Sequence, residues 1–426
     1  MTKWTVTGTH RVRASRLDTK SHGWAAAADR PTVTHVCRTL AIIAMLGIVA
    51  TEAYAQRLQA ALSGQPRFSE QRDGRTLPAD VHPETRNRLP GIPGASGSAS
   101  GADGIRGRGS GVDVRWESVV GRPLLELAIL TTAREHDQPY EWSLHEMEAV
   151  AVGLDPAVID IVRNRASITG LGEAEAVVIN LGREMFGQYQ LSFETYARAV
   201  SLFDEGPFVD VVLLMSRYAS TAIRLTAFNQ HMPPGWPQFL PLPFTLPDDI
   251  DLDSRSRLPR LPAPAERLRR TPSLYGRTLS PEGTGPGQIR GHGAGLASLE
   301  AHVPRSLIDL AILVTAREYD SQYVWTVTEP SALEHGLAPE IIDIIRHDGS
   351  LTGLAESEAA LIAFGRELLG VHTVRPETYQ RVSGVFSTSD LVDLVDVMAG
   401  YVADITLLIA FDQQLPEGQR PLLTPR

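Results

Sequence analysis

The chain has 426 residues and a formal net charge of −10, with 40 Lys plus Arg against 50 Asp plus Glu. This acidic balance argues against a nucleic-acid-binding protein, which normally carries a basic face. The single cysteine, Cys37, excludes an intrachain disulfide, a Cys-x-x-Cys redox pair and a multi-cysteine zinc site.

The N-terminal segment, residues 1–55, has the pattern of a signal peptide. Basic residues precede the apolar run LAIIAMLGIVA at 40–50, and Ala53-Tyr54-Ala55 follows with small residues where signal peptidase needs them. The run is shorter than the roughly 20 residues that span a bilayer, although an uncleaved membrane anchor is the alternative. We therefore predict cleavage after Ala55, which would also remove Cys37, and export to the periplasm or the medium.

The remainder of the chain contains two similar segments separated by irregular ones. Residues 56–120 and 233–304 are rich in Gly, Pro, Ser and Arg, as linkers are. Residues 121–232 (copy one) and 305–415 (copy two) match without a gap at an offset of 183 positions, and a tail follows at 416–426. For example, ELAILTTAREHDQPYEW pairs with DLAILVTAREYDSQYVW. Two copies indicate a tandem duplication, because solenoids need three or more short repeats.

Each copy is predicted to be all-helical. Apolar residues recur at spacings of three and four from Leu124 onward. Asp155-Pro156 is typical of a helix N-cap followed by proline at the first helical position. Amphipathic helices are expected over 173–185 and 192–203. The long, mostly apolar helix expected over 209–228 would lie centrally or at a subunit contact.

One stretch of copy one carries a family pattern. It contains E-L-A-I-L on one helix, then A-R-E, then Y-E-W-x-x-H, then a G-L-x-P helix start, and all of these fall within 122–156. In these features the chain resembles the carboxymuconolactone decarboxylase family, over 122–230 and again over 305–413. The resemblance implies two tandem all-helical domains with a fold like that of alkylhydroperoxidase D. It also implies self-association through helices, or a pseudo-dimer of the two copies.

The peroxidase branch of this family is characterised by Glu-x11-Cys-x2-Cys-x3-His. In copy one, Glu126 and His145 match its glutamate and histidine, but Gln138 and Glu141 stand at the cysteine positions. In copy two, the same spacing gives Asp309, Ser321, Val324 and Thr328, so only a carboxylate remains there. Peroxide reduction of this type needs a thiolate, so we do not expect cysteine-based peroxidase activity.

Decarboxylation of a lactone acid, in contrast, needs no redox group. Loss of carbon dioxide leaves a dienolate, which must be stabilised and protonated, and histidine suits proton delivery near neutral pH. We predict His145 as the proton donor or acceptor, Glu141 as its partner one helical turn away, and Glu126 as the group that orients the imidazole. The alternatives are a structural histidine and two solvated or ion-paired carboxylates.

Tyr140, Trp142 and Arg134 are the predicted contacts for the substrate, a small organic acid or lactone. Each of them has a counterpart in copy two, so a core or ion-pair role is the alternative. No H-E-x-x-H or other recognised metal spacing occurs, and we expect neither a metal nor a cofactor.

Together these observations predict an exported, cofactor-independent carboxy-lyase whose site lies in copy one. Copy two would be a structural half, because a fused pair lets one half lose its site while the interface remains. The alternative is a non-catalytic exported binding or assembly protein that retains the fold.

Overall fold

The computed structural model of the protein describes residues 77–91, 100–240, 246–262, 283–424 and 426. The predicted signal peptide and its cleavage site lie outside these residues. Regular secondary structure in the described part is helical, apart from one isolated bridge between His82 and Asn87, which confirms the all-helical prediction. None of the described helices is long and apolar enough to cross a membrane.

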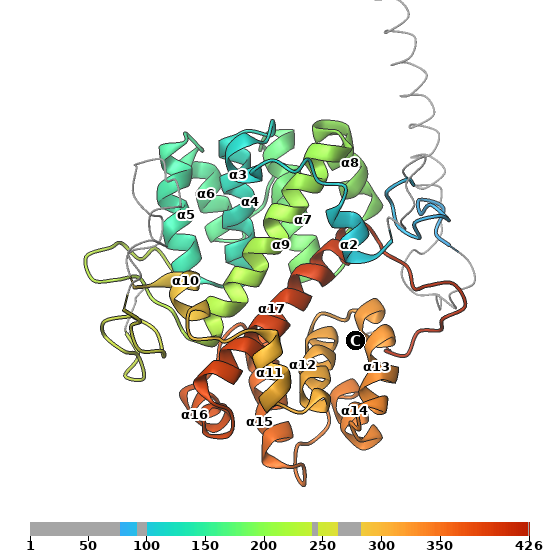
Figure 1. Ribbon diagram of the computed structural model, residues 1–426. Coiled ribbons are helices and arrows are strands. Elements are labelled where there is room, and N and C mark those ends of the chain that lie inside the picture. The colour runs from blue at the N-terminus through green and yellow to red at the C-terminus, as the bar shows by residue number, and fades with distance from the viewer. Residues whose placement is uncertain (1–76, 92–99, 241–245, 263–282, 425) are drawn as a thin grey trace, which may run out of the picture. The chain divides into compact units, whose positions relative to one another are not determined.

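The two copies have the same order of helices (Figure 1). Copy one consists of α4 (Arg122–Glu135), α5 (Pro139–Ala151), α6 (Pro156–Arg163), α7 (Glu173–Gly187), α8 (Phe193–Phe203) and α9 (Glu205–Ala227). Copy two consists of α12 (Arg305–Glu318), α13 (Gln322–Glu334), α14 (Pro339–Arg346), α15 (Glu356–Gly365), the π-helical turn η2 (Arg366–Val371), α16 (Pro376–Val385) and α17 (Thr388–Ala410). The counterpart of α7 is therefore divided between α15 and η2.

Local chemistry explains where α5 begins. Asp137 has a φ of 48°, a left-handed conformation that ends the preceding helix. The side chain of Gln138 then accepts a hydrogen bond from the backbone N–H of Tyr140 at 2.8 Å and caps the new helix. Pro139 follows at the first helical position, where its missing N–H costs nothing. The tight turn places α5 against α4, the two helices that carry the predicted catalytic residues.

A glycine in each copy permits the next helix to approach closely. A Cβ atom at Gly182 of α7 would collide with Thr131 of α4, and one at Gly365 of α15 would collide with Val314 of α12. Only glycine allows these backbones to come so near without displacing a side chain. This packing requirement accounts for the first glycine of the repeated sequences GREMFG and GRELLG.

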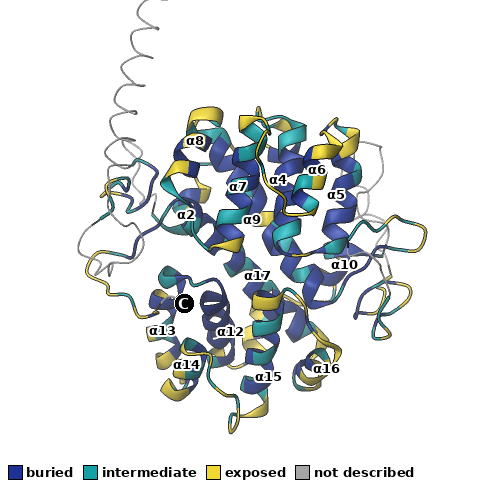
Figure 2. Cartoon of the chain, turned by 180° about the vertical axis from the view of Figure 1, so that it is seen from behind, coloured by how far each residue is buried: buried dark blue, intermediate teal, exposed yellow. Residues whose placement is uncertain are grey.

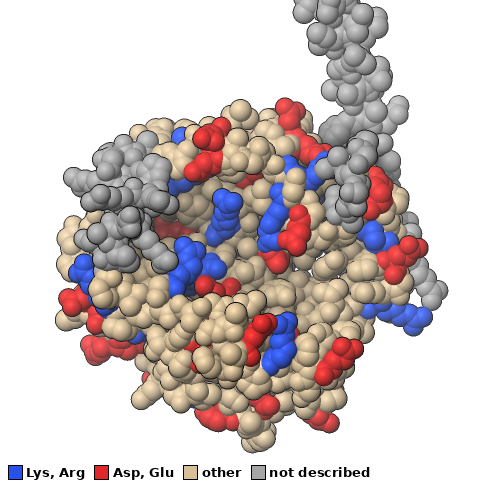
Figure 3. All heavy atoms as spheres, viewed as in Figure 1, with Lys and Arg blue, Asp and Glu red and all other residues tan. Residues whose placement is uncertain are grey.

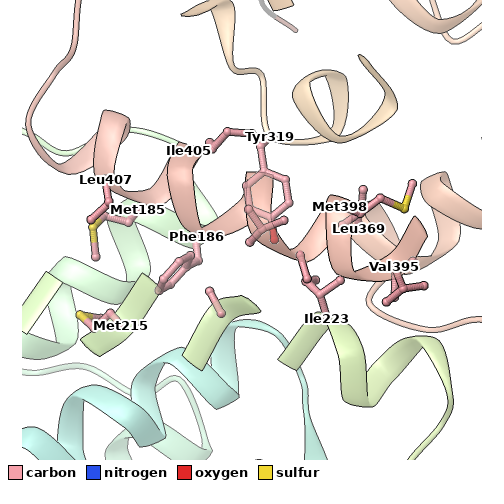
Figure 4. Close-up of a cluster of buried hydrophobic side chains, with 14 of the residues drawn as sticks. Met185, Phe186, Met215, Ile223, Tyr319, Leu369, Val395, Met398, Ile405 and Leu407 are labelled. Atoms are coloured by element: carbon pink, nitrogen blue, oxygen red, sulfur yellow. The ribbon is translucent and has the colours of Figure 1, made fainter. Parts of the chain in front are cut away.

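The two copies pack against each other through their long helices, α9 and α17 (Figure 1). Figure 2 shows that both are buried along most of their length. Side chains from both copies interdigitate between them (Figure 4), namely Met185, Phe186, Met215 and Ile223 with Tyr319, Leu369, Val395, Met398, Ile405 and Leu407. Both copies belong to one compact unit, residues 71–426.

The segments expected to be irregular contain short helices as well. These are α2 (Gly101–Arg106) and α3 (Val114–Glu117) before copy one, and α10 (Gly285–Arg290) and α11 (Leu296–His302) before copy two. The expectation was wrong here because a single apolar anchor suffices: Ile105 and Ile289 are both fully buried. The glycine-rich composition of these segments gave no indication that Ile105 and Ile289 would be buried.

The same segments contain a second pair of repeats at a different offset. LPADVHPETRNRLP lies in residues 77–91 (arm one), and LPDDIDLDSRSRLP lies in residues 246–262 (arm two). The backbone N–H of Arg88 in arm one donates to the carbonyl of Phe411 in copy two at 2.8 Å, and its guanidinium donates to the carbonyl of Leu191 in copy one at 2.9 Å. Arg257 of arm two makes the equivalent bonds to Phe228 at 2.8 Å and Val374 at 2.7 Å. Each arm therefore bridges the two copies.

Candidate acid–base site

Glu126 and His145 form a buried pair in copy one. Glu126 lies on α4 and is 0% exposed, and His145 lies on α5 and is 5% exposed. The Nδ1 atom of His145 is 2.7 Å from Oε2 of Glu126. Because a carboxylate can only accept, Nδ1 carries the proton, and Nε2 is left with a free lone pair in the neutral imidazole.

Two arginines also hold the Glu126 carboxylate. Both Nε and Nη2 of Arg115 donate to its Oε1 at 3.0 Å, and Nη2 of Arg122 donates to the same oxygen at 2.7 Å. Burial alone would raise the pKa of Glu126, but His145 and the two guanidinium groups outweigh burial and lower it to about 2. Glu126 is therefore ionised throughout the physiological range.

The imidazole of His145 is held neutral. Burial lowers its pKa, and the Arg115 cation lowers it further, against the opposing effect of Glu126. The ring of Tyr218, from α9, meets the imidazole edge-on with centroids 4.8 Å apart. At neutral pH its Nε2 can accept a proton, whereas the proton on Nδ1 is held in the hydrogen bond to Glu126.

Glu141 has the opposite electrostatic environment. It lies one helical turn before His145, is 2% exposed, and neither carboxyl oxygen has a hydrogen-bond partner among the described residues. Burial raises its pKa well above the usual value and so favours the neutral acid. Burial also raises the pKa of Tyr218, and the carboxyls of Glu126 and Glu141 both add to that rise. The site thus combines a proton-holding acid and a neutral imidazole beside one phenol.

Unpartnered donors lie at the same site. In the described part of the chain, Nε and Nη1 of Arg122 are buried without a hydrogen-bond partner. The indole of Trp116 covers this guanidinium, with its centroid 4.1 Å from the central carbon. Stacking does not satisfy in-plane N–H groups, so Arg122 can still donate to an oxygen of a bound molecule.

The three predicted substrate contacts have other partners. The hydroxyl of Tyr140 lies 2.8 Å from that of Thr284, and the indole N–H of Trp142 donates to Glu146 at 2.6 Å. Arg134 donates through Nε to the carbonyl of Arg163 at 2.7 Å and pairs with Asp137. The structure therefore brings together Glu126 and His145, with Glu141 one turn away, but gives none of these other three a hydrogen bond to that group.

Sequence reasoning missed three members of the site, Arg115, Arg122 and Tyr218. Two of them could have been identified from the sequence. Arg122 lies four residues before Glu126 and recurs as Arg305 before Asp309, and Tyr218 recurs as Tyr401. Arg115 could not, because it belongs to the glycine-rich segment and reaches the site only through the position of α3.

Copy two contains a second carboxylate–imidazole pair. Nδ1 of His335 is 2.6 Å from Oδ2 of Asp309, and Nε of Arg305 is 3.2 Å from Oδ1. As predicted, the position aligned with His145 is not a histidine in copy two but Thr328. The prediction that only a carboxylate remains there was wrong for the structure, however, because His335 supplies an imidazole to Asp309. His335 lies seven residues, or two helical turns, beyond Thr328, and so occupies the same face of the chain at the end of α13.

No group of three or more metal-ligating side chains occurs among the described residues. No protein-family model, curated protein or solved structure matches the chain.

Proposed function

We propose that the protein is an exported, cofactor-independent decarboxylase of a small unsaturated organic acid or lactone, with its site in copy one. One observation carries the proposal: the buried, unpartnered carboxyl of Glu141 lies one helical turn from the imidazole that Glu126 orients. A neutral carboxylic acid kept protonated at pH 7 is a proton donor, and the neutral imidazole is an acceptor.

Each group has a role in this reaction. The two unpartnered N–H groups of Arg122 bind an oxygen of the substrate and orient it. The bond from the substrate carbon to its carboxylate breaks, carbon dioxide leaves, and the electron pair delocalises into the unsaturated system. The carbon then takes the proton of Glu141. His145 passes a proton from solvent back to Glu141, which restores the starting state.

The proposal is tested by following loss of γ-carboxymuconolactone in the ultraviolet together with carbon dioxide release. We expect the unmodified protein to turn over this or a related unsaturated acid, and Glu141→Gln and His145→Gln each to reduce kcat by about 100-fold or more. Glu146→Gln is the matched control, because Glu146 lies on the same helix and contacts Trp142 instead. Folded protein that releases no carbon dioxide from a panel of such acids, or Glu141→Gln at full activity, contradicts the proposal.

A specific observation favours the alternative, a non-catalytic exported protein that binds or assembles. The Glu126 carboxylate already accepts hydrogen bonds from two arginines and one histidine, as in a structural ion-pair network. In that case Glu141→Gln would leave activity and ligand binding unchanged, and could raise the free energy of unfolding.

A further inference from the structure

An open cleft of about 510 Å³ lies between α12 and α17 of copy two, with α11 and Arg106 of α2 also lining it. Its apolar part is formed by Ile308, Ile312 and Val397, with Leu296 at the edge, half exposed. Arg305 and Tyr401 are among its polar lining residues, and both interact electrostatically with Asp309. A mostly apolar cleft with a few polar groups is the usual form of a small-molecule site.

Sequence differences between the copies explain why this cleft is open. In copy one, Arg115 and Trp116 of α3 cover the equivalent carboxylate and arginine. Ser298 and Leu299 stand at the aligned positions of α11, so neither a guanidinium nor an indole covers Arg305. Gly400, which lines the cleft, likewise replaces Arg217. Copy two thus has a smaller side chain than copy one at each of these three positions, in keeping with an open cleft.

Two donors in the cleft have no partner. Nε of Arg305 donates to Asp309 and Nη1 donates to Glu300, but Nη2 has no hydrogen bond within the described ranges. The hydroxyl of Tyr401 has none there either. Both groups can donate to one oxygen-bearing group, and a guanidinium and a phenol together suit a carboxylate.

The acidic residues of the cleft are already compensated. Asp393 accepts the backbone N–H groups of Ala294 and Gly295 at 3.0 and 2.9 Å. Asp396 is paired with Arg224, and Asp404 with Arg106. Figure 3 shows that basic and acidic side chains lie next to each other on this face of the molecule, without a large patch of one sign. The cleft thus offers no free acid to a cation, and its acids disfavour a second negative charge on a ligand.

We propose that this cleft is a second ligand site, separate from the acid–base site of copy one, and that it binds a small apolar monocarboxylate. The carboxylate is held by Nη2 of Arg305 and the hydroxyl of Tyr401, while the apolar part contacts Ile308, Ile312 and Val397. Arg305 connects the ligand to the Asp309–His335 pair, since Asp309 bonds both residues.

The probe is benzoate, titrated into the full chain by calorimetry and by NMR of the histidine imidazoles. We expect saturable binding that shifts the His335 signal, which is assigned with His335→Gln and reports on the cleft through Asp309 and Arg305. Arg305→Gln should weaken binding by at least 10-fold. Gly400→Leu should abolish the His335 shift by placing a side chain in the cleft, and no atom lies within 4 Å of a Cβ built at Gly400, so the substitution fits.

Gly384→Leu is the matched control, because Gly384 lies on α16 and has equally open space around it. It should bind benzoate as the unmodified protein does. Absence of a saturable His335 shift overturns the proposal, as does a His335 shift that survives Gly400→Leu. Preferential binding of hexylammonium over benzoate also overturns it, since the acids would then dominate. His145→Gln should leave the benzoate-induced shift of His335 intact, so failure of the decarboxylase proposal is distinguishable from failure of this one.

Discussion

Each copy of this protein contains an imidazole–carboxylate–guanidinium cluster, but the cluster of copy one is more deeply buried than that of copy two. Copy one has Arg122, Glu126 and Tyr218 at the positions where copy two has Arg305, Asp309 and Tyr401. The histidine comes from a different helical turn in each copy, yet its Nδ1 meets the carboxylate in both. The comparison teaches that the duplicated scaffold retains an imidazole–carboxylate–guanidinium cluster even where the sequence position of the histidine is lost.

The largest expected difference concerns the two carboxylates. Glu126→Gln leaves Arg115 and Arg122 without their common buried partner, which should lower the free energy of unfolding by about 3–5 kcal/mol. Asp309→Asn should cost only about 1 kcal/mol, because the side chains of Arg305 and His335 are 43% and 38% exposed and water can solvate them. Urea unfolding of both variants measures the difference. Equal losses of unfolding free energy would show that the two clusters do not differ in the effect of burial.

A second expected effect concerns a pair of histidines where the copies meet. His136 of copy one donates from Nδ1 to the carbonyl of Thr132 at 2.8 Å, so its Nε2, 3.2 Å away from the hydroxyl of Tyr319, accepts. Its ring lies 5.2 Å from that of His372. Burial lowers the pKa of His136 to about 3 and that of His372 to about 4, and in each case a nearby cation or imidazole adds to the effect.

Because both folded-state pKa values lie below the unfolded value of 6.5, the unfolded chain binds more protons between them. The free energy of unfolding should therefore be highest above pH 6.5 and fall as the pH drops. Between pH 6.5 and 4.5, His136 alone should account for about 2–3 kcal/mol of that loss. We expect His136→Gln to reduce the difference in unfolding free energy between these two pH values, whereas His302→Gln, at an exposed position, serves as the control. An unchanged difference in His136→Gln would contradict the assignment.

The smallest expected effect concerns the matched tryptophans. Trp142 donates to Glu146 at 2.6 Å beneath Arg163, and Trp325 donates to Glu329 at 2.5 Å beneath Arg346. Each Trp→Phe substitution should cost about 1–2 kcal/mol of unfolding free energy, and the two costs should be similar. Neither should change kcat or KM. A change in KM for the copy-one variant alone would instead support the predicted substrate contact.

Much of the fold could be predicted from the sequence, because apolar periodicity and capping residues act locally. The Glu126–His145 pair was also predictable, since the spacing places the residues on adjacent helices. Arg134 is a less suitable substrate contact, because it lies eight positions after Glu126 on the same helix, which is about 12 Å along the axis. The roles of Arg115 and His335 could not be predicted from the sequence. Arg115 reaches the site through the packing of a glycine-rich segment, and His335 lies two helical turns beyond the position that aligns with His145.

The arms give the fused chain a property that neither copy has alone. The carbonyls that end α9 and α17, at Phe228 and Phe411, are each satisfied by an arm that is also bound to the other copy. Separating the copies would expose these carbonyls as well as the apolar side chains between the long helices. The two copies should therefore unfold in one cooperative transition, and a substitution that destabilises either copy should destabilise both.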